Sequence, residues 1–282
     1  MTDQQLKAQA QILQELHKGP EILVMLNAWD VVSAVILADM GFPAIATTSA
    51  GIAFARGYPD GQRIPRHEMI GEIERIAHAV EIPVAADLEV GYGDAPETVG
   101  ETISLAITAG AVGANIEDSY PDHPDRQYQT GEAVERIQSA RAAAESAGVP
   151  FVINARCDNF LPGRERNAEL IADAIERLNA YKSAGADCLY TPWVGDAETI
   201  VVLVRELDGP LNILAGPQTI PIQELKRLGV RRVTTGGGLY RSCLGHLGKA
   251  ARELQDLGAY THIKGAPSHA SIDKLLKSET GS

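Results

Sequence analysis

Short apolar runs alternate with longer amphipathic stretches along most of the chain. Stretches such as AVERIQSARAAAESAG and AELIADAIERLNAYKSAG carry apolar residues at helical spacing. The runs between them, such as PVAADLE and PFVINAR, are apolar without strict alternation, which is typical of strands buried on both faces. Alternating helices and strands of this kind predict an α/β protein with a parallel sheet.

Glycine and proline mark where the strands begin. A helical stretch ends in glycine just before a strand at Gly41, Gly110, Gly185 and Gly229. A proline introduces the strand at Pro83, Pro150 and Pro210. These patterns predict seven strands, and the run ILVMLNA near residue 22 is an eighth. Eight strand–helix units in about 250 residues predict a (β/α)8 TIM barrel, with a doubly wound open sheet as the rival.

The expected organisation of the 282 residues is a helix over 1–19, a barrel over 20–260, and a C-terminal helix and tail over 261–282. The net charge of −12 argues against a nucleic-acid or anionic-membrane partner. The three cysteines form no CxxC pair, and no apolar run reaches the roughly 20 residues of a membrane span. We therefore expect a cytoplasmic protein.

Polar residues follow the predicted strands, at the end of a barrel where functional side chains gather. They include Asn27, Thr48, Ser49, Asp87, Glu89, Glu117, Asp118, Asn154, Arg156, Asp158 and Tyr190, with Asn212 at the end of the seventh strand as a candidate substrate contact. Four carboxylates from two adjacent strands are expected to converge beside Arg156. A bound cation resolves their repulsion, and oxygen ligands favour Mg²⁺ or Mn²⁺ over zinc. The alternative is a structural ion network of Glu117, Asp118 and Arg156.

Other chemistries fit these positions less well. A Schiff-base lysine inside the barrel is missing, because Lys182, Lys226 and Lys249 fall in helical stretches. His123, in the loop after the fourth strand, is either a mobile acid or base or a solvated residue. The run TTGGGL after the eighth strand either cradles a phosphate or makes a tight turn.

Three motifs resemble the isocitrate lyase / phosphoenolpyruvate mutase superfamily. They are DLEVGYG at 87–93, IED at 116–118 and NARCDNF at 154–160, and the resemblance runs from about residue 20 to 250. It implies a barrel whose eighth helix is exchanged between subunits, usually in a dimer of dimers. It also implies Mg²⁺ chelated by the carboxylate and the 2-oxo oxygen of a small substrate.

The resemblance assigns roles to individual positions. Asp87 matches the direct metal ligand, Glu89 stands where members usually have Asp, Glu117 matches an acid that holds metal-bound water, and Asp60 resembles an acid near the metal. Thr48 and Ser49 match residues that bind the substrate carboxylate. Arg156 matches the arginine that steadies the developing enolate oxygen, which is the type of stabilisation a preorganised cation provides.

The segment SYPDHPDRQYQTG departs from the family pattern. It lacks both the Lys-Lys/Arg-Cys-Gly-His motif of the lyases and the lysine-rich gating loop of the mutases. Tyr120, His123 and Tyr128 are its candidate proton donors. Cys157 lies on a different strand from the lyase cysteine and is expected to be a packed thiol.

The leading hypothesis is a Mg²⁺-dependent enzyme that breaks a bond β to the carbonyl of a small 2-oxo acid through an enolate, as in oxaloacetate decarboxylation. The alternative reaction is carbon–phosphorus chemistry on phosphonopyruvate. The alternative of another class is a non-catalytic protein that senses a 2-oxo acid.

Overall fold

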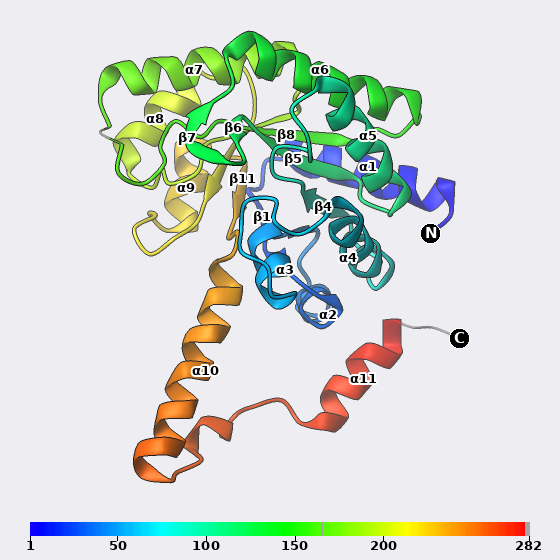
Figure 1. Cartoon of the computed structure of the whole chain (residues 1–282), viewed down its shortest axis with the longest axis vertical. Helices are drawn as coiled ribbons and strands as arrows, with labels where there is room; N and C mark the ends of the chain where they lie inside the picture. The colour runs from blue at the N-terminus through cyan, green and yellow to red at the C-terminus, as the bar shows by residue number, and fades with distance from the viewer. Residues whose placement is uncertain (165, 280–282) are drawn as a thin grey trace.

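The computed structural model of this chain describes residues 1–164 and 166–279. Within those ranges, nine parallel strands form one sheet that curls into a barrel surrounded by helices (Figure 1). In chain order the strands are β1 (Leu23–Met25), β2 (Asn27–Ala28), β3 (Ile45–Thr47), β4 (Val84–Asp87), β5 (Gly113–Glu117), β8 (Val152–Arg156), β9 (Cys188–Tyr190), β10 (Leu211–Leu214) and β11 (Arg232–Thr234). The predicted TIM barrel is confirmed, and the rival open sheet is wrong.

The first strand of the barrel is divided into two pieces. β1 pairs with β11 at one end of the strand order, and β2 pairs with β3 at the other. Leu26 separates them, and its carbonyl accepts a hydrogen bond from Ala46 N at 2.9 Å. The prediction of one continuous strand over ILVMLNA is therefore wrong in this detail. The run breaks because a twisted sheet closes by pairing this segment with both of its neighbours.

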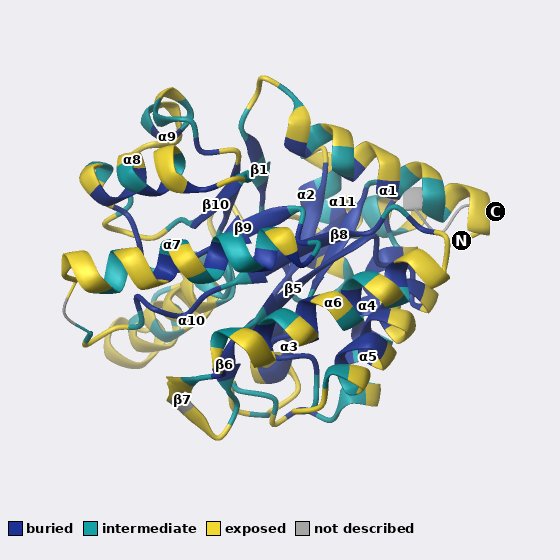
Figure 2. Ribbon diagram, turned by 90° about the horizontal axis from the view of Figure 1, so that it is seen from above, coloured by how far each residue is buried: buried dark blue, intermediate teal, exposed yellow. Residues whose placement is uncertain are grey.

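Helices cover the outside of the barrel. They are α2 (Val31–Asp39), α3 (Ser49–Ala55), α4 (Arg66–His78), α5 (Pro96–Thr108), α6 (Thr130–Ser146), α7 (Ala168–Ser183), α8 (Ala197–Glu206) and α9 (Ile222–Leu228). In Figure 2 the strands are buried and the outer faces of the helices are exposed. The predicted glycine turns are confirmed, since Gly41, Gly110, Gly185 and Gly229 have φ values of +83°, +95°, +110° and +96°.

The N-terminal helix α1 (Asp3–Lys18) packs against the barrel. Its buried residues are Ala10, Leu13 and His17. A Cβ at Gly113, the first residue of β5, would lie 3.0 Å from Leu13 Cδ2 and 2.9 Å from Val152 O. Glycine at this position therefore lets α1 close the end of the barrel where the strands begin.

The C-terminal elements form an arm (Figure 1). α10 (Gly238–Leu257) points away from the barrel, and α11 (His269–Glu279) returns to contact α2 after the short helix η1 (Thr261–Ile263). The structure describes all of α10, and none of its residues is buried. Its exposed apolar residues include Leu244, Leu247, Leu254 and Leu257. Exchange of this helix between subunits stays a prediction.

The segment after β5, where the sequence predicts a loop, contains a hairpin. β6 (Ser119–Tyr120) pairs antiparallel with β7 (His123–Gln127), with Pro121 and Asp122 at the turn. Pro and Asp suit a tight reversal of the chain, and this explains the difference. Asp122 forms an ion pair with Arg63 at 2.9 Å, and Arg164 donates to Asp125 O at 2.6 Å. The hairpin is thus tied to two neighbouring loops.

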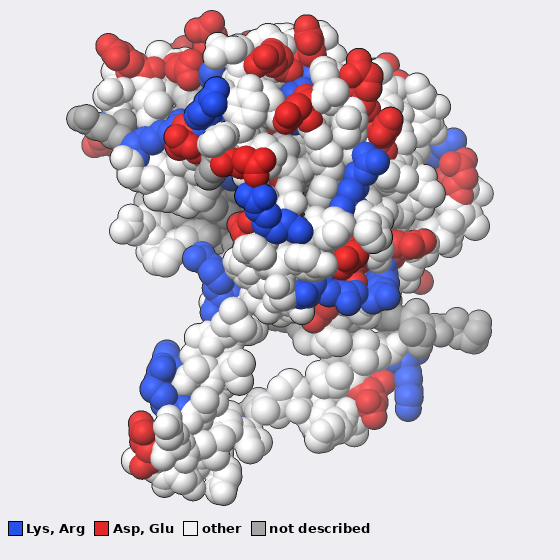
Figure 3. Space-filling view, in the orientation of Figure 1, with Lys and Arg blue, Asp and Glu red and all other residues white. Residues whose placement is uncertain are grey.

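Acidic and basic side chains are interspersed on the face that Figure 3 shows. No continuous basic surface is visible there, which agrees with the net charge of −12. In residues 1–164 and 166–279, no helix has the length and apolar character needed to cross a membrane.

Candidate active site

Asp87, the last residue of β4, is held by four hydrogen bonds. Its backbone N donates to Thr47 Oγ1 at 2.9 Å. Its Oδ2 accepts from Ser49 N at 3.0 Å and from Ser49 Oγ at 2.8 Å, and its Oδ1 accepts from Asn115 Nδ2 at 3.2 Å. Neighbours on both sides of β4 therefore orient this carboxylate before any ligand arrives.

Glu89 follows Asp87 in a strained turn. Gln62 N donates to Glu89 Oε2 at 2.8 Å, and Tyr92 N donates to Gln62 Oε1 at 2.6 Å. These three residues have left-handed backbones, with φ values of +57° at Gln62, +52° at Glu89 and +64° at Tyr92. Such conformations cost about 1–3 kcal/mol per non-glycine residue, and they concentrate at functional sites.

Glu89 and Asp60 lie in an acidic environment with Asp87. Burial, followed by the charges of Asp87 and Asp60, raises the pKa of Glu89 to about 8. Burial and then Asp87 also raise the pKa of the Asp60 carboxyl. Glu89 Oε1 is buried and has no hydrogen-bond partner among the described residues. This cluster is therefore self-repelling, and a cation would relieve the repulsion.

Arg156, the last residue of β8, faces the cluster with its charge held in place. Its Nη1 lies 2.6 Å from Glu117 Oε2, and its Nε and Nη2 donate to the Asp158 carboxylate at 2.6 and 3.1 Å. The rings of Tyr190 and Trp193 lie 5.8 and 5.5 Å from the guanidinium carbon. Burial lowers the pKa of Arg156, but Asp158 and Glu117 raise it by more. Two of the five guanidinium N–H groups remain for another acceptor.

Asp118 does not join the other carboxylates. Its oxygens accept hydrogen bonds from Tyr181 Oη at 2.7 Å and from Gln127 Nε2 at 3.1 Å. Consecutive residues of a strand face opposite sides, so Glu117 and Asp118 cannot both point into the barrel. The predicted convergence is wrong for Asp118. The alternative ion network is also wrong for Asp118, because Arg156 pairs with Glu117 and Asp158.

Thr48 and Ser49 lie beside Asp87, at the start of α3. Thr48 is the N-cap, and its Oγ1 accepts from Gly51 N at 3.3 Å. Both the N–H and the hydroxyl of Ser49 donate to Asp87. Their assignment to a substrate carboxylate stays a prediction.

Asn212 lies deeper than predicted. β10 continues to Leu214, so the prediction that the strand ends at Asn212 is wrong. Its side chain is 0% exposed, and its Oδ1 accepts from Thr234 Oγ1 at 3.3 Å. The strand continues for two apolar residues after Asn212, and the local sequence does not show where it ends.

The TTGGGL turn is fastened to the first strand. Asn27 Oδ1 accepts from Thr235 N and from Gly236 N, each at 2.8 Å. Gly238 N donates to Thr235 O at 3.0 Å, and Gly236 has a φ of +49°. Because these N–H groups already have acceptors, the structure favours the tight turn over the phosphate cradle.

The three proton-donor candidates of the hairpin region differ in their surroundings. Tyr128 is buried, and its hydroxyl donates to Asp94 Oδ1 at 2.6 Å. The Tyr120 ring lies 4.1 Å from the Tyr128 ring, and His123 is exposed on β7. Tyr128 thus belongs to the packing of the hairpin. Roles for Tyr120 and His123 stay predictions.

Comparison with known proteins agrees with this geometry. The family model described as phosphoenolpyruvate phosphomutase matches residues 13–255. The chain belongs to this family. An uncharacterised protein of Mycobacterium tuberculosis is 34% identical over 247 residues, which cover 86% of this chain and 88% of that protein. An oxaloacetate decarboxylase of Pseudomonas entomophila is 32% identical over 222 residues, covering 76% and 73% of the two chains.

Solved structures show the same relationship. A Burkholderia cenocepacia protein, named only provisionally as a lyase/mutase, superposes with a TM-score of 0.90 at 41% identity over 96% of each chain. Oxaloacetate acetylhydrolase in complex with the product oxalate superposes with a TM-score of 0.83 at 25% identity, over 95% of this chain and 93% of that one. The phosphomutase-family chain described here is therefore an enzyme of a superfamily of lyases and mutases.

The acidic cluster suits a hydrated divalent cation. No group of three or more His, Cys, Asp or Glu side chains in the described ranges already forms a direct metal cage. Mg²⁺ does not need one, because it keeps several waters and takes one or two carboxylates together with oxygens of the substrate. The unpartnered Glu89 Oε1 beside Asp87 and Asp60 fits that type of site.

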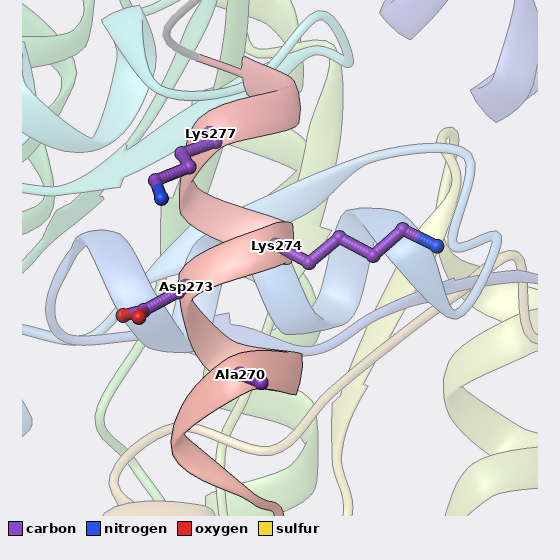
Figure 4. A pocket seen from close by; sticks show the side chains of 4 residues that line it. All are labelled: Ala270, Asp273, Lys274 and Lys277. Carbon is purple, nitrogen blue, oxygen red and sulfur yellow. The ribbon is translucent and has the colours of Figure 1, made fainter.

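A separate hollow lies beside α11 and is lined by Ala270, Asp273, Lys274 and Lys277 (Figure 4). It is open, and it belongs to the C-terminal arm rather than to the strand ends. Its lysines and single aspartate belong to none of the three family motifs, so this hollow is not part of the candidate active site.

Sequence reasoning missed several residues of the site. Asp158 follows a predicted strand, but the local sequence does not show its two hydrogen bonds to Arg156. Asn115 lies two residues before Glu117, and the two-residue period of a strand could have placed it on the same face. Gln62 gave no such signal, because it reaches Glu89 from a distant loop. Cys157 is buried as predicted, and burial raises the pKa of its thiol.

Proposed function

We propose that this enzyme is a Mg²⁺-dependent carbon–carbon lyase that cleaves the bond β to the carbonyl of a small 2-oxo acid, with oxaloacetate as the first candidate. The observation that carries the proposal is the placement of a fixed guanidinium, Arg156, opposite the acidic group of Asp60, Asp87 and Glu89. The relatives include an oxaloacetate decarboxylase and an oxaloacetate acetylhydrolase, which supports this substrate class.

When bound, Mg²⁺ would supply a Lewis acid that polarises the 2-oxo group, held by Asp87 with Glu89, Glu117 and Asp60 through water. The free N–H groups of Arg156 would donate to the oxygen on which negative charge develops. Tyr190 and Trp193 flank that guanidinium and would limit the access of water to it.

For oxaloacetate, the bond between C3 and C4 breaks and its electron pair moves into the enolate of pyruvate, while CO₂ leaves. A proton then adds at C3. Tyr120 and His123 are the proposed donors from the hairpin, with water as the remaining source. Tyr128 is not proposed, because its hydroxyl is engaged by Asp94.

The test is turnover of a 2-oxo acid panel, with oxaloacetate and phosphonopyruvate, in Mg²⁺ and in excess chelator. Asp87→Ala is expected to abolish metal-dependent turnover while the protein stays folded, since Asp87 lies at a half-buried strand end. Full activity of that variant would sink the proposal. Turnover of phosphonopyruvate alone would assign the carbon–phosphorus reaction, and Mg²⁺-dependent binding without any turnover would indicate a sensor.

We also propose that the enzyme assembles as a homo-oligomer through α10. This helix has no buried residue in the single chain and carries a row of exposed leucines. Sedimentation or light scattering gives the mass directly. A monomer at micromolar concentration would overturn this part of the proposal.

A further inference from the structure

The interior of this barrel is unusually polar. Partner residues in neighbouring parallel strands point to the same face, so the pairing Glu117–Arg156–Tyr190–Asn212–Arg232 places all five on the inner face. Branched apolar residues normally fill this space in TIM barrels. A polar interior must satisfy its hydrogen bonds without bulk water, so each donor and acceptor in it needs a partner.

Two amides connect Asp87 to the middle of the barrel. Asn115 Nδ2 donates to Asp87 Oδ1 at 3.2 Å, and Asn154 Nδ2 donates to Asn115 Oδ1 at 3.2 Å. The direction of this relay is set by chemistry, because an ionised carboxylate only accepts. Each amide therefore presents its NH₂ toward Asp87 and its oxygen away from it. The relay must end at a donor.

The last acceptor of the relay, Asn154 Oδ1, has no donor among the described residues. Asn154 is 1% exposed. An unsatisfied buried acceptor costs about 1–3 kcal/mol. We therefore expect a hydrogen-bond donor that also lacks a partner to lie near Asn154 Oδ1.

Arg232 is such a group. It is 3% exposed, and its Nε and Nη1 are buried without a partner in the described part of the chain. Burial lowers the pKa of this guanidinium, and the charges of Cys188, Tyr190 and Asp87 oppose that change. A buried cation without hydrogen bonds is strongly unfavourable, and arginine offers donors only.

Two further groups complete the set. Asn212 Nδ2 is a second buried donor that has no partner among the described residues. His17 Nδ1 lies 2.7 Å from Leu13 O and must donate to that carbonyl, so the unpartnered Nε2 is an acceptor. Burial and then Arg232 lower the pKa of His17 to about 4, which keeps it neutral. Arg232 and Asn212 thus offer buried donors, and Asn154 and His17 offer buried acceptors, all without a partner among the described residues. Buried water, which donates and accepts, can join groups of this kind.

We propose that enclosed water joins Arg232 to Asn154 Oδ1, and that Arg232 thereby anchors the relay that positions Asp87. Arg232 is a positioning residue, because it acts on Asp87 through Asn154 and Asn115. The inference rests on the proposed function only in taking Asp87 as a metal ligand. A cation at one end and a carboxylate at the other polarise the intervening amides in the same direction.

The consequence is a measurable effect on metal affinity. Loss of a group that orients a metal ligand typically weakens metal binding by about 10–100-fold. A purely through-space effect of Arg232 has the opposite sign, because removing a positive charge near the site would strengthen the binding of a cation. The direction of the change therefore separates positioning from simple electrostatics.

The experiment is a calorimetric titration with Mn²⁺, without substrate, of the wild type and of Arg232→Met, Asn154→Leu and the double variant. We expect each single variant to bind Mn²⁺ roughly tenfold more weakly, and the double variant to bind no more weakly than the weaker single. Arg231→Met is the matched control, since Arg231 donates to Gly19 O at an exposed position and should leave the affinity unchanged. Unchanged or tighter binding by Arg232→Met overturns the proposal. If that variant does not fold, the crystal structure of the wild type decides the role of Arg232.

A crystal structure of the wild type provides the second readout. Water within hydrogen-bond distance of both an Arg232 nitrogen and Asn154 Oδ1 supports the relay. Arg232 paired instead with an anion, away from Asn154, refutes it. Failure of the wild type to bind Mn²⁺ would count against the proposed function, and the crystal structure would then decide the relay by itself.

Discussion

Glu89→Gln should stabilise this protein at alkaline pH in the absence of metal. Glu89 is 5% exposed, and its carboxyl titrates at about 8 in the fold against 4.5 for an ordinary glutamate. Between pH 4.5 and about 8, the Glu89 carboxyl is therefore protonated in the folded state and ionised in the unfolded chain. Stability of the wild type must fall as the pH rises from 4.5 to about 8. Glutamine resembles the protonated acid and removes this loss.

The size of the effect follows from the shift. At about 1.4 kcal/mol per pKa unit, the upper limit is about 5 kcal/mol above pH 8. Urea denaturation in the presence of chelator at pH 5, 6.5 and 8 gives the free energy of unfolding of the variant and of the wild type. The difference between the two isolates the effect of Glu89, because the other titrating groups are the same in both proteins. The two proteins should be nearly equal at pH 5, with the variant clearly more stable at pH 8. Adding Mg²⁺ at pH 8 should stabilise the wild type much more than the variant.

Parallel pH profiles for the two proteins would refute the reasoning, because the Glu89 carboxyl would then titrate alike in the folded and unfolded states. Equal stabilisation of both by Mg²⁺ would refute the assignment of Glu89 to the metal site, while leaving the pH argument intact.

Two substitutions and one labelling experiment test the framework around the site. Arg136→Met should destabilise the fold by about 3 kcal/mol in urea denaturation, because Arg136 is buried and donates to the carbonyls of Gly93, Asp94 and Val90; a loss below 0.5 kcal/mol would contradict this. Gly113→Ala should cost about 1–3 kcal/mol by overpacking against α1, and an unchanged midpoint would show that α1 can shift freely. Cys157 should resist thiol reagents in the native state and react once urea unfolds the chain, and equal labelling rates of Cys157 in the two states would contradict its burial.

The order of elements, the barrel class and the carboxylates at the ends of β4 and β5 were readable from the sequence. Local signals carry them: the glycine after each helix, the proline before a strand and the apolar runs depend on residues close together in the chain. The family motifs assigned Asp87 and Arg156 to one site, because they bring distant segments of the chain into one pattern.

Only the tertiary structure decided which neighbour each polar group meets. Asp118 turns away from Glu117 because the pleat alternates, and β10 continues past Asn212 because strand length depends on the neighbouring strands. The burial of the Arg232 guanidinium cannot be predicted from RRVTT, where Arg231 and Arg232 both resemble surface arginines. Whether it lies inside the barrel depends on register across five strands, and register is a property of the closed sheet rather than of any one segment.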